Sequence, residues 1–492
     1  MSDHVDVLIV GAGLSGVGAA HHIHAAFPRR TYAILEARER SGGTWDLFRY
    51  PGVRSDSDMQ TLGYRFRPWT QAKAIADGPA ILDYIRDTAA EAGIDRHIRY
   101  GHRVVSAAWS TEDAEWTAEI LRDGETVVMT AKFLYLCTGY YHYDGGYTPE
   151  FPEIERFGGP VIHPQQWPED LDYADKKVVV IGSGATAVTL VPAMTDKAEH
   201  VTMLQRSPTY ILARPGEDKL ANRLRRLLGD RVGYMVTRWK NVAMATLLYQ
   251  LSRRRPGMIK SLIRKTTVRL LPPGYDVDTH FKPSYNPWDQ RLCLVPDGDL
   301  FQAIRHGKAS VVTDEIAGFT DSSIRLKSGA DLPADIVVTA TGLRLLAFGG
   351  IRLAVDGREI KLPETMAYKG MMLSGLPNFV FTIGYTNASW TLKADLVAEY
   401  TVRVLKHMDS NGFTQCVPVA DPAVAERPLL DFAAGYVQRT VHEFPRSGSR
   451  QPWQLGMSYA NDVILLRHGK IDDGTLRFSA GRPATHNRVV VK

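Results

Sequence analysis

Two short apolar runs, each ending in a Gly-rich turn, form the clearest pattern along this chain. Residues 5–10 and 177–181 are rich in Val and Ile, a composition typical of strands buried on both faces of a parallel sheet. A helical pattern follows the first turn over residues 17–26, and the second turn also opens a helix. A strand that leads through such a turn into a helix predicts a Rossmann-like unit at each place.

Two further runs repeat this pattern later in each unit. Residues 133–137 and 335–339 read as buried strands, and each is followed by a glycine turn, at Gly139 and Gly342. Self-similarity of this kind indicates two units of like construction. The fold class that we expect is therefore α/β, with two nested Rossmann-like dinucleotide-binding domains and a helical insertion.

The other elements are predicted more coarsely. Residues 71–93 read as helical, and residues 102–109 and 116–121 read as strands around a turn. Residues 377–384 read as a strand that returns to the first unit, and a helix is expected near Trp390. We expect the proline-containing C-terminal part to form helices and loops over the substrate side.

A basic segment interrupts the second unit. Residues 216–275 read as amphipathic helices, and between Lys219 and Arg269 there are fourteen Lys and Arg residues against one acid, Asp230. Two interpretations stay open: a solvated cover over the substrate channel, and peripheral contact of residues 219–269 with an anionic membrane. Nucleic-acid binding is not expected, because no known binding motif is present.

The first Gly-rich turn has the form G-x-G-x-x-G. The helix after it offers N–H groups and the positive end of its dipole to a pyrophosphate. The next strand ends in an acid, twenty residues past the last glycine, where a carboxylate accepts hydrogen bonds from ribose hydroxyls and disfavours a 2′-phosphate. We therefore expect FAD at this turn, held by Gly11, Gly13, Ser15, Gly16 and Glu36.

The second turn differs in the residues that end the following strand. This strand ends in Arg206 and Ser207 rather than in an acid. A guanidinium can pair with a phosphate through two hydrogen bonds, and a hydroxyl adds a donor. This contrast with the first turn predicts NADPH rather than NADH at the second, bound by the turn residues Gly182, Ser183, Gly184, Ala185, Thr186 and Ala187 together with Arg206 and Ser207.

Bulk properties limit the alternatives. A length of 492 residues indicates roughly two to four domains, and 44% hydrophobic with 23% charged residues is typical of globular proteins. No apolar run reaches the ~18 residues of a membrane span, and the chain enters its first strand at once, which leaves no room for a signal peptide. Three widely spaced cysteines form neither a C-x-x-C pair nor a zinc site, so we expect a cytoplasmic protein without a metal.

A connector joins the two predicted cofactor sites. Residues 157–168 read Phe-Gly-Gly-Pro-Val-Ile-His-Pro-Gln-Gln-Trp-Pro and match the pattern F-x-G-x-x-x-H-x-x-x-W-P at every fixed position. In this motif, and over nearly its whole length from Asp6, the chain resembles the type I Baeyer–Villiger monooxygenases. Stretches at residues 43–51, 286–293 and 384–390 are closer still to the mycobacterial ethionamide-activating members of that family.

The resemblance implies a reaction. Members of this family bind FAD, consume NADPH and O₂, and convert ketones to esters or lactones through a C4a-peroxyflavin. The closer likeness implies that sulfides or thioamides are oxidised as well. The expected partners are therefore O₂ and a small ketone or sulfide.

The resemblance also implies roles for single residues. Arg291 aligns with the arginine that stabilises the peroxide, Asp56 with its hydrogen-bond partner, and His163 with the motif histidine that influences catalysis; Gln290 stands where the family often has Lys. Contacts with FAD are implied for Thr44, Trp45, Asp46, Leu47, Arg54, Asp56 and, through its backbone, Val104.

These assignments predict domain boundaries and leave three rival functions. We expect an FAD domain at 1–145 and 345–492 (with the C-terminal cover), a linker at 146–168, an NADP domain at 169–215 and 276–344, and the insertion at 216–275. The nearest rival is a flavin monooxygenase that oxidises only N or S. Enzymes of that class usually have an aromatic residue other than Trp at the motif position that Trp167 occupies here. The others are a pyridine-nucleotide reductase, whose disulfide branch the missing cysteine pair disfavours, and a non-catalytic membrane-docked binding protein.

Overall fold

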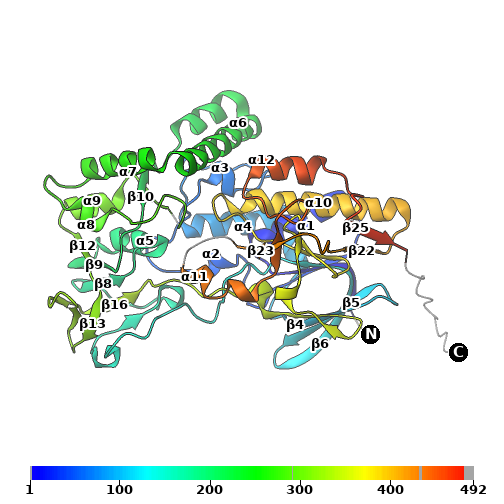
Figure 1. Ribbon diagram of the computed structural model, residues 1–492, viewed down its shortest axis with the longest axis horizontal. Coiled ribbons are helices and arrows are strands. Elements are labelled where there is room, and N and C mark those ends of the chain that lie inside the picture. Colours follow the sequence, from blue (N-terminus) through cyan, green and yellow to red (C-terminus); the bar gives the residue numbers. More distant parts are fainter. Residues whose placement is uncertain (1–2, 291, 431–434, 481–492) are drawn as a thin grey trace.

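The computed structural model describes residues 3–290, 292–430 and 435–480. Two sheets lie side by side along the long axis of the molecule (Figure 1). Two long helices, α6 and α7, lie along one edge of the molecule, outside the two sheets. The chain starts in one sheet, crosses to the other after residue 145, and returns to the first after residue 345. The second unit is therefore nested within the first.

The first sheet is built on parallel strands in the order β21-β6-β1-β2-β3. Their bounds are Phe379–Phe381, Glu125–Leu136, Asp3–Val10, Tyr32–Leu35 and Ile98–Arg99. The inner residues of β1 and all of β2 are shielded from solvent, which explains their near-continuous apolar sequence.

The second sheet repeats this arrangement with parallel strands in the order β7-β16-β8-β9-β12. Their bounds are Val161–Ile162, Ile336–Thr339, Lys177–Ile181, His200–Gln205 and Ala309–Thr313. The central strand of each sheet, β1 or β8, leads into a Gly-rich turn, and the next strand lies beside it. The prediction of two Rossmann-like units is confirmed.

Each unit also carries an antiparallel meander on one side of its sheet. In the first unit the meander joins β4, β5 and the start of β6, and β17 and β18 extend it. In the second it consists of β13, β14 and β15. The bounds are Arg103–Ser110, Glu115–Arg122, Arg352–Val355, Arg358–Glu359, Ile316–Phe319, Ser323–Leu326 and Asp331–Pro333.

Helices cover the opposite side of each sheet. In the first unit α1 (Leu14–Ala26), α4 (Gly78–Glu91) and α10 (Trp390–Asn411) pack into one apolar cluster with β1 and β2. In the second, α5 (Ala185–Met194) and α9 (Asp299–Arg305) do the same with β8 and β9. The helix predicted from residue 71 begins only at Gly78, because the Asp77 carboxylate caps it by accepting from the Ala80 N–H.

The basic insertion consists of α6 (Lys219–Arg254) and α7 (Pro256–Leu270). It lies between β10 (Ile211–Arg214) and β11 (Cys293–Pro296), a parallel pair. The α6 backbone is broken at Gly229, whose φ is +76°. No helix among the described residues is long and apolar enough to cross a bilayer.

The remaining elements are short. They are α2 Thr44–Leu47, α3 Met59–Leu62, α8 Val277–His280, α11 Gly435–Gln438, α12 Tyr459–Asp462, β19 Ala367–Tyr368, β20 Met372–Leu373, β22 Gln415–Pro418, β23 Glu426–Pro428, β24 Arg446–Gly448 and β25 Leu476–Ser479. The C-terminal cover thus contains short strands as well as the expected helices and loops. We propose that the domain boundaries lie where the chain leaves and re-enters each sheet, near residues 145, 168 and 345.

Candidate active site

The two Gly-rich turns are built in the same way. A Cβ on Gly11 would lie 2.5 Å from the carbonyl oxygen of Cys137, and a Cβ on Gly182 would lie 2.3 Å from that of Ala340. Both glycines have φ above +100°, a conformation that other L-residues rarely adopt. Each turn is therefore pressed against the end of the neighbouring strand, β6 or β16, and only glycine fits there.

The first turn leaves the start of α1 open. The N-cap of α1 is Gly13, and among the described residues no side chain caps this end of the helix. By contrast, Asp77 and Asp218 cap α4 and α6. The first N–H groups of α1 are thus free of a side-chain acceptor, as an anion-binding helix end requires.

Glu36 is held close to this turn. Its Oε2 accepts from the Ala12 N–H (2.8 Å) and its Oε1 from the Arg38 N–H (3.0 Å). Burial raises the pKa of this carboxyl, and the two backbone hydrogen bonds oppose that shift. Each carboxylate oxygen keeps acceptor capacity. Strand β4 starts beside it, since the His102 N–H donates to the Glu36 carbonyl (2.9 Å), which brings the predicted adenine contact Val104 to the same corner.

The loop after residue 42 is fixed by a buried acid. Asp46 is 2% exposed, and its oxygens accept from Arg38 (2.7 Å) and Arg86 (2.8 Å). This double ion pair fastens α2 to α4 and holds Thr44, Trp45 and Leu47 next to the first turn; Gly43 packs against Gly13. The structure thus brings most of the residues predicted for FAD together, although contact with FAD itself stays a prediction.

Trp390 contacts the first Gly-rich turn, which the sequence did not predict. Its Nε1–H donates to the Ser15 hydroxyl (2.7 Å), and its ring packs at 5.2 Å from that of Tyr140. Trp390 is the first residue of α10, so this hydrogen bond ties the returning C-terminal segment to the first turn. A helix was expected at this position, but the partner of Ser15 lies 375 residues away and had no local signal.

The second turn is connected to the predicted phosphate-binding pair. The Ser183 hydroxyl donates to the Ser207 carbonyl (3.2 Å) and is 2.8 Å from the Thr209 hydroxyl. Arg206 is exposed and forms no close ion pair among the described residues, although its charge adds to that of Lys327 in lowering the pKa of Glu315. Helix α5 begins after Gly184 without a side-chain cap in the described part of the chain, Ala185 and Thr186 form its first turn, and Ala187 is fully buried against the sheet. All of these residues lie at one end of β8 and β9.

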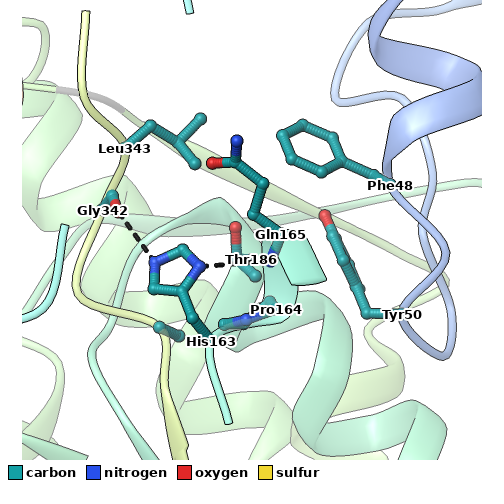
Figure 2. Close-up of a pocket in the computed structure, with 9 residues that line it drawn as sticks. Phe48, Tyr50, His163, Pro164, Gln165, Thr186, Gly342 and Leu343 are labelled. Atoms are coloured by element: carbon teal, nitrogen blue, oxygen red, sulfur yellow. Dashed lines mark hydrogen bonds between the residues drawn. The ribbon is translucent and has the colours of Figure 1, made fainter. Parts of the chain in front are cut away.

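His163 joins the connector to the second sheet. Its Nε2–H donates to the Gly342 carbonyl (3.0 Å), and its Nδ1 accepts from the Gln165 N–H (3.2 Å) (Figure 2). These two bonds select the neutral ring with its proton on Nε2. Burial lowers the pKa of His163, the nearby Arg344 lowers it further, and the bond to Gly342 opposes both. In the structure both ring nitrogens of His163 are therefore engaged with backbone groups of the described residues.

A narrow cavity adjoins this histidine. It is lined by Phe48, Tyr50, His163, Pro164, Gln165, Thr186, Ala340, Gly342 and Leu343 (Figure 2). Its volume is about 20 Å³, enough for roughly one water molecule. The Gln165 amide is buried among these residues, and its Oε1 has no hydrogen-bond partner among the described residues. A buried acceptor beside a space of this size is suited to one bound water molecule.

Arg54 and Asp56 lie on a loop of the first unit that contacts the second unit. Arg54 pairs with Asp299 of α9 (2.5 Å), so its side chain joins the two units, an arrangement that the FAD-contact prediction did not anticipate. Asp56 is half-buried in the same loop. The next turn is capped by Asp58, which accepts from the Thr61 N–H. Arg291 lies outside the described residues, so its predicted meeting with Asp56 stays a prediction.

Comparison with known proteins places this architecture in a family. Residues 75–261 match the flavin-binding monooxygenase-like family, and residues 9–77 match an NAD(P)-binding Rossmann-like domain. The FAD-containing monooxygenase EthA of Mycobacterium tuberculosis is 58% identical over 488 residues, which cover 98% of this chain and 99% of that protein.

Two solved structures share the whole fold at low identity. A steroid monooxygenase bound to NADP has a TM-score of 0.74 at 21% identity, covering 97% of this chain and 100% of that one. The cyclohexanone monooxygenase of Rhodococcus sp. Phi1 bound to NADP⁺ has a TM-score of 0.74 at 19% identity, covering 98% and 100%. These likenesses agree with two nested dinucleotide-binding units. The identity to EthA over almost the full length shows that this chain belongs to the FAD-containing monooxygenases of the flavin-binding monooxygenase family.

Proposed function

We propose that this protein is a Baeyer–Villiger monooxygenase that converts ketones to esters or lactones and also oxidises sulfides or thioamides. The reaction balances as ketone, O₂, NADPH and a proton giving ester, NADP⁺ and water. The observation that carries the proposal is the connector of residues 157–168. It matches the Baeyer–Villiger pattern at every fixed position, and its histidine is hydrogen-bonded to the end of β16 between two open Gly-rich turns. The relatives with the same fold include a steroid and a cyclohexanone monooxygenase.

The first turn fits FAD. The uncapped start of α1 offers N–H groups to a pyrophosphate, and Glu36 is held where a ribose hydroxyl can donate to it. We propose that Gly11, Gly13, Ser15, Gly16, Glu36 and residues 44–47 hold this cofactor. When bound and reduced, FAD supplies the chemistry that activates O₂.

The second turn fits NADPH. Its helix end is also uncapped in the described part of the chain, and Arg206 and Ser207 stand exposed beside it. A guanidinium that forms no close ion pair with the described carboxylates is suited to a 2′-phosphate. The unsatisfied Gln165 Oε1 is a further acceptor at the junction of the two units.

The oxygen transfer requires a cation that keeps its proton. Attack on a ketone carbonyl needs an anionic oxygen nucleophile, and arginine stays charged under all ordinary conditions. We propose that Arg291 stabilises that negative charge and that Asp56 orients Arg291 and balances its charge. An enzyme that oxidises only sulfur or nitrogen needs a protonated, electrophilic oxygen instead, which a fixed cation does not favour.

We propose a positioning role for His163. Both of its ring nitrogens are engaged with backbone groups, those of Gly342 and Gln165. It fixes the connector against Gly342, and thereby sets the distance between the two cofactors. A change at His163 should therefore alter the coupling of NADPH oxidation to product formation rather than remove one chemical step.

The first experiment combines purified holoenzyme with NADPH, O₂ and a panel of ketones and sulfides, and follows NADPH consumption together with product mass. Esters from ketones support the proposal. Sulfoxides without any ester refute it in favour of the heteroatom-oxidising alternative. Substitution of Arg291 by Ala should leave reduction of the flavin by NADPH largely unchanged, because hydride transfer needs no such cation. Ester formation should fall by about 10²- to 10³-fold, a loss comparable to that of one charge-stabilising donor. Ester formation at the normal rate in this variant would remove Arg291 from the mechanism.

A further inference from the structure

The helical insertion exposes an unusual number of large apolar side chains. Within the described residues, eleven of the seventeen exposed large apolar side chains lie on α6 and α7. They are Leu220, Leu227, Leu228, Val232, Val236, Trp239, Met244, Leu247, Met258, Leu262 and Val268. Single exposed apolar residues are ordinary, whereas a cluster of this size marks an interaction surface. We call the surface that they form on these two helices the outer α6–α7 surface.

The exposed residues of α6 form a continuous stripe. Val232, Val236, Trp239, Ala243 and Leu247 follow one another at spacings of three or four residues and are all exposed, so they share one face of the helix. The opposite face is buried, with Tyr234, Thr237, Arg238 and Asn241 packed against the first unit. The helix therefore buries one face against the first unit and leaves the apolar stripe exposed, apart from the Trp239 ring, which lies 5.7 Å from the ring of Tyr459.

Unpaired positive charge precedes and follows this stripe along the chain. Nine basic side chains of the insertion form no ion pair with any residue that the structure describes: Lys219, Arg223, Arg226, Arg231, Arg254, Arg255, Lys260, Lys265 and Arg269. The single acid of the segment, Asp230, already pairs with Arg225 (3.1 Å). The partner of this surface must therefore offer both an apolar region that receives the stripe and negative charge that pairs with the bases.

We infer that the outer α6–α7 surface docks the protein on an anionic lipid bilayer. A helix whose apolar stripe is flanked by Lys and Arg lies in the plane of the interface, with the stripe among the acyl chains and the bases at the headgroups. A second copy of the chain fits poorly, because a symmetric contact would bring the same positive surfaces together. The two helices lie along one edge of the molecule (Figure 1), where a flat surface can reach them.

The inner face of α6 braces the candidate active site. Arg238 donates to the carbonyls of Gln60 (2.9 Å), Thr61 (3.2 Å) and Gly63 (2.7 Å), just after Asp56.

Near its C-terminal end, α6 contacts the segment that precedes Arg291 in the sequence. Arg253 pairs with Asp289 (2.6 Å) and Tyr249 packs at 5.7 Å from Trp288, just before Arg291. Helix α6 therefore has one face toward the proposed bilayer and the opposite face toward the candidate active site. If the proposed function holds, this places lipid-soluble ketones, drawn from the bilayer, as the substrate class.

The test measures binding to lipid separately from activity. Purified holoenzyme is sedimented with sucrose-loaded vesicles at low and at high salt. One set of vesicles contains phosphatidylcholine alone, and the other also contains about 30% phosphatidylglycerol, enough for a strongly anionic surface. We expect co-sedimentation with the anionic vesicles, and weaker binding to the neutral ones. Failure of the full-length holoenzyme to bind anionic vesicles at low salt overturns the inference, whatever the enzyme does with ketones in the absence of vesicles.

Two pairs of variants locate the surface. Val236→Glu with Leu247→Glu should lower vesicle partitioning at least about tenfold, because two side chains lose their place among the acyl chains; the control is Leu121→Glu with Val419→Glu, which adds the same charge at exposed apolar sites elsewhere. Arg226→Gln, Arg255→Gln and Lys265→Gln should together lower it on the order of a hundredfold, since each base near an anionic surface contributes roughly fivefold. Arg103→Gln, Arg352→Gln and Arg358→Gln form the matched control.

Bound flavin and far-ultraviolet circular dichroism confirm that each variant is folded. Binding that is equal in the insertion variants and their controls overturns the assignment of the surface. The protein could instead form a dimer in vesicle-free solution that Val236→Glu with Leu247→Glu converts to a monomer. That result would identify a second copy of the chain as the occupant of the surface, and it would also overturn the inference of lipid docking. Turnover of a water-soluble ketone without vesicles should be the same in all four variants, so failure of the docking inference and failure of the proposed reaction give different results.

Discussion

Replacing Gly146 by alanine tests the connector most directly. Gly146 lies against the ring of His163: a Cβ there would be 1.8 Å from Cε1 and 2.1 Å from Nε2. Non-bonded carbon atoms need about 3.5 Å, so the ring has to move by more than about 1 Å. The 3.0 Å bond from Nε2–H to the Gly342 carbonyl cannot survive a displacement of that size.

The magnitude follows from the hydrogen bond that this displacement breaks. One buried hydrogen bond contributes about 1 kcal/mol. The Gly342 carbonyl still accepts from the Tyr147 N–H (3.0 Å), so the further cost is that of forcing an extra methyl group into a filled space, about 1–3 kcal/mol. We therefore expect Gly146→Ala to lower the free energy of unfolding by about 2 kcal/mol or more. Because the connector then no longer fixes the two units at Gly342, we also expect more NADPH to be oxidised without product, released as hydrogen peroxide.

The neighbouring glycine provides the control. A Cβ on Gly145 would meet nothing within 4 Å, and its φ is not positive, so Gly145→Ala should behave as wild type. The assay is thermal unfolding of the holoenzyme together with the ratio of product to NADPH consumed. If Gly146→Ala and Gly145→Ala give the same stability and the same coupling ratio, the proposed packing of His163 is wrong. Lower stability with unchanged coupling would mean that this histidine only supports the fold.

Two further predictions concern the second cofactor and pH. Arg206→Ala should raise the KM for NADPH about tenfold to a hundredfold, the loss of one charge-assisted contact, and leave the KM for NADH nearly unchanged; equal effects on both coenzymes in steady-state kinetics would refute the phosphate contact. The pKa of His163 in the folded chain is below its usual value of about 6.5. As pH falls, the unfolded chain therefore binds this proton before the folded chain does. The stabilisation that His163 contributes is present above about pH 6.5 and is lost at lower pH. The difference in melting temperature between wild type and His163→Asn should therefore shrink between about pH 7.5 and 5, and a constant difference would show that the pKa of His163 is the same in the folded and the unfolded chain.

The sequence alone determined the fold class, and it predicted a cofactor for each of the two turns. Apolar runs followed by Gly11 and Gly182 specify strands that end in tight turns, because local backbone geometry and the burial of a parallel strand leave few alternatives. The contrast between Glu36 and Arg206 likewise needed no coordinates, since the charge of the side chain decides which nucleotide it favours.

The tertiary structure decided which distant residues meet. The bond from Trp390 to Ser15, the ion pair of Arg54 with Asp299 and the packing of Gly146 on His163 join segments that no periodicity connects. Amphipathic periodicity marked the insertion as helical, but it cannot show which apolar face packs on the protein and which stays exposed. Such contacts depend on how the two nested units and the insertion pack as a whole, a property of the folded chain rather than of any local stretch.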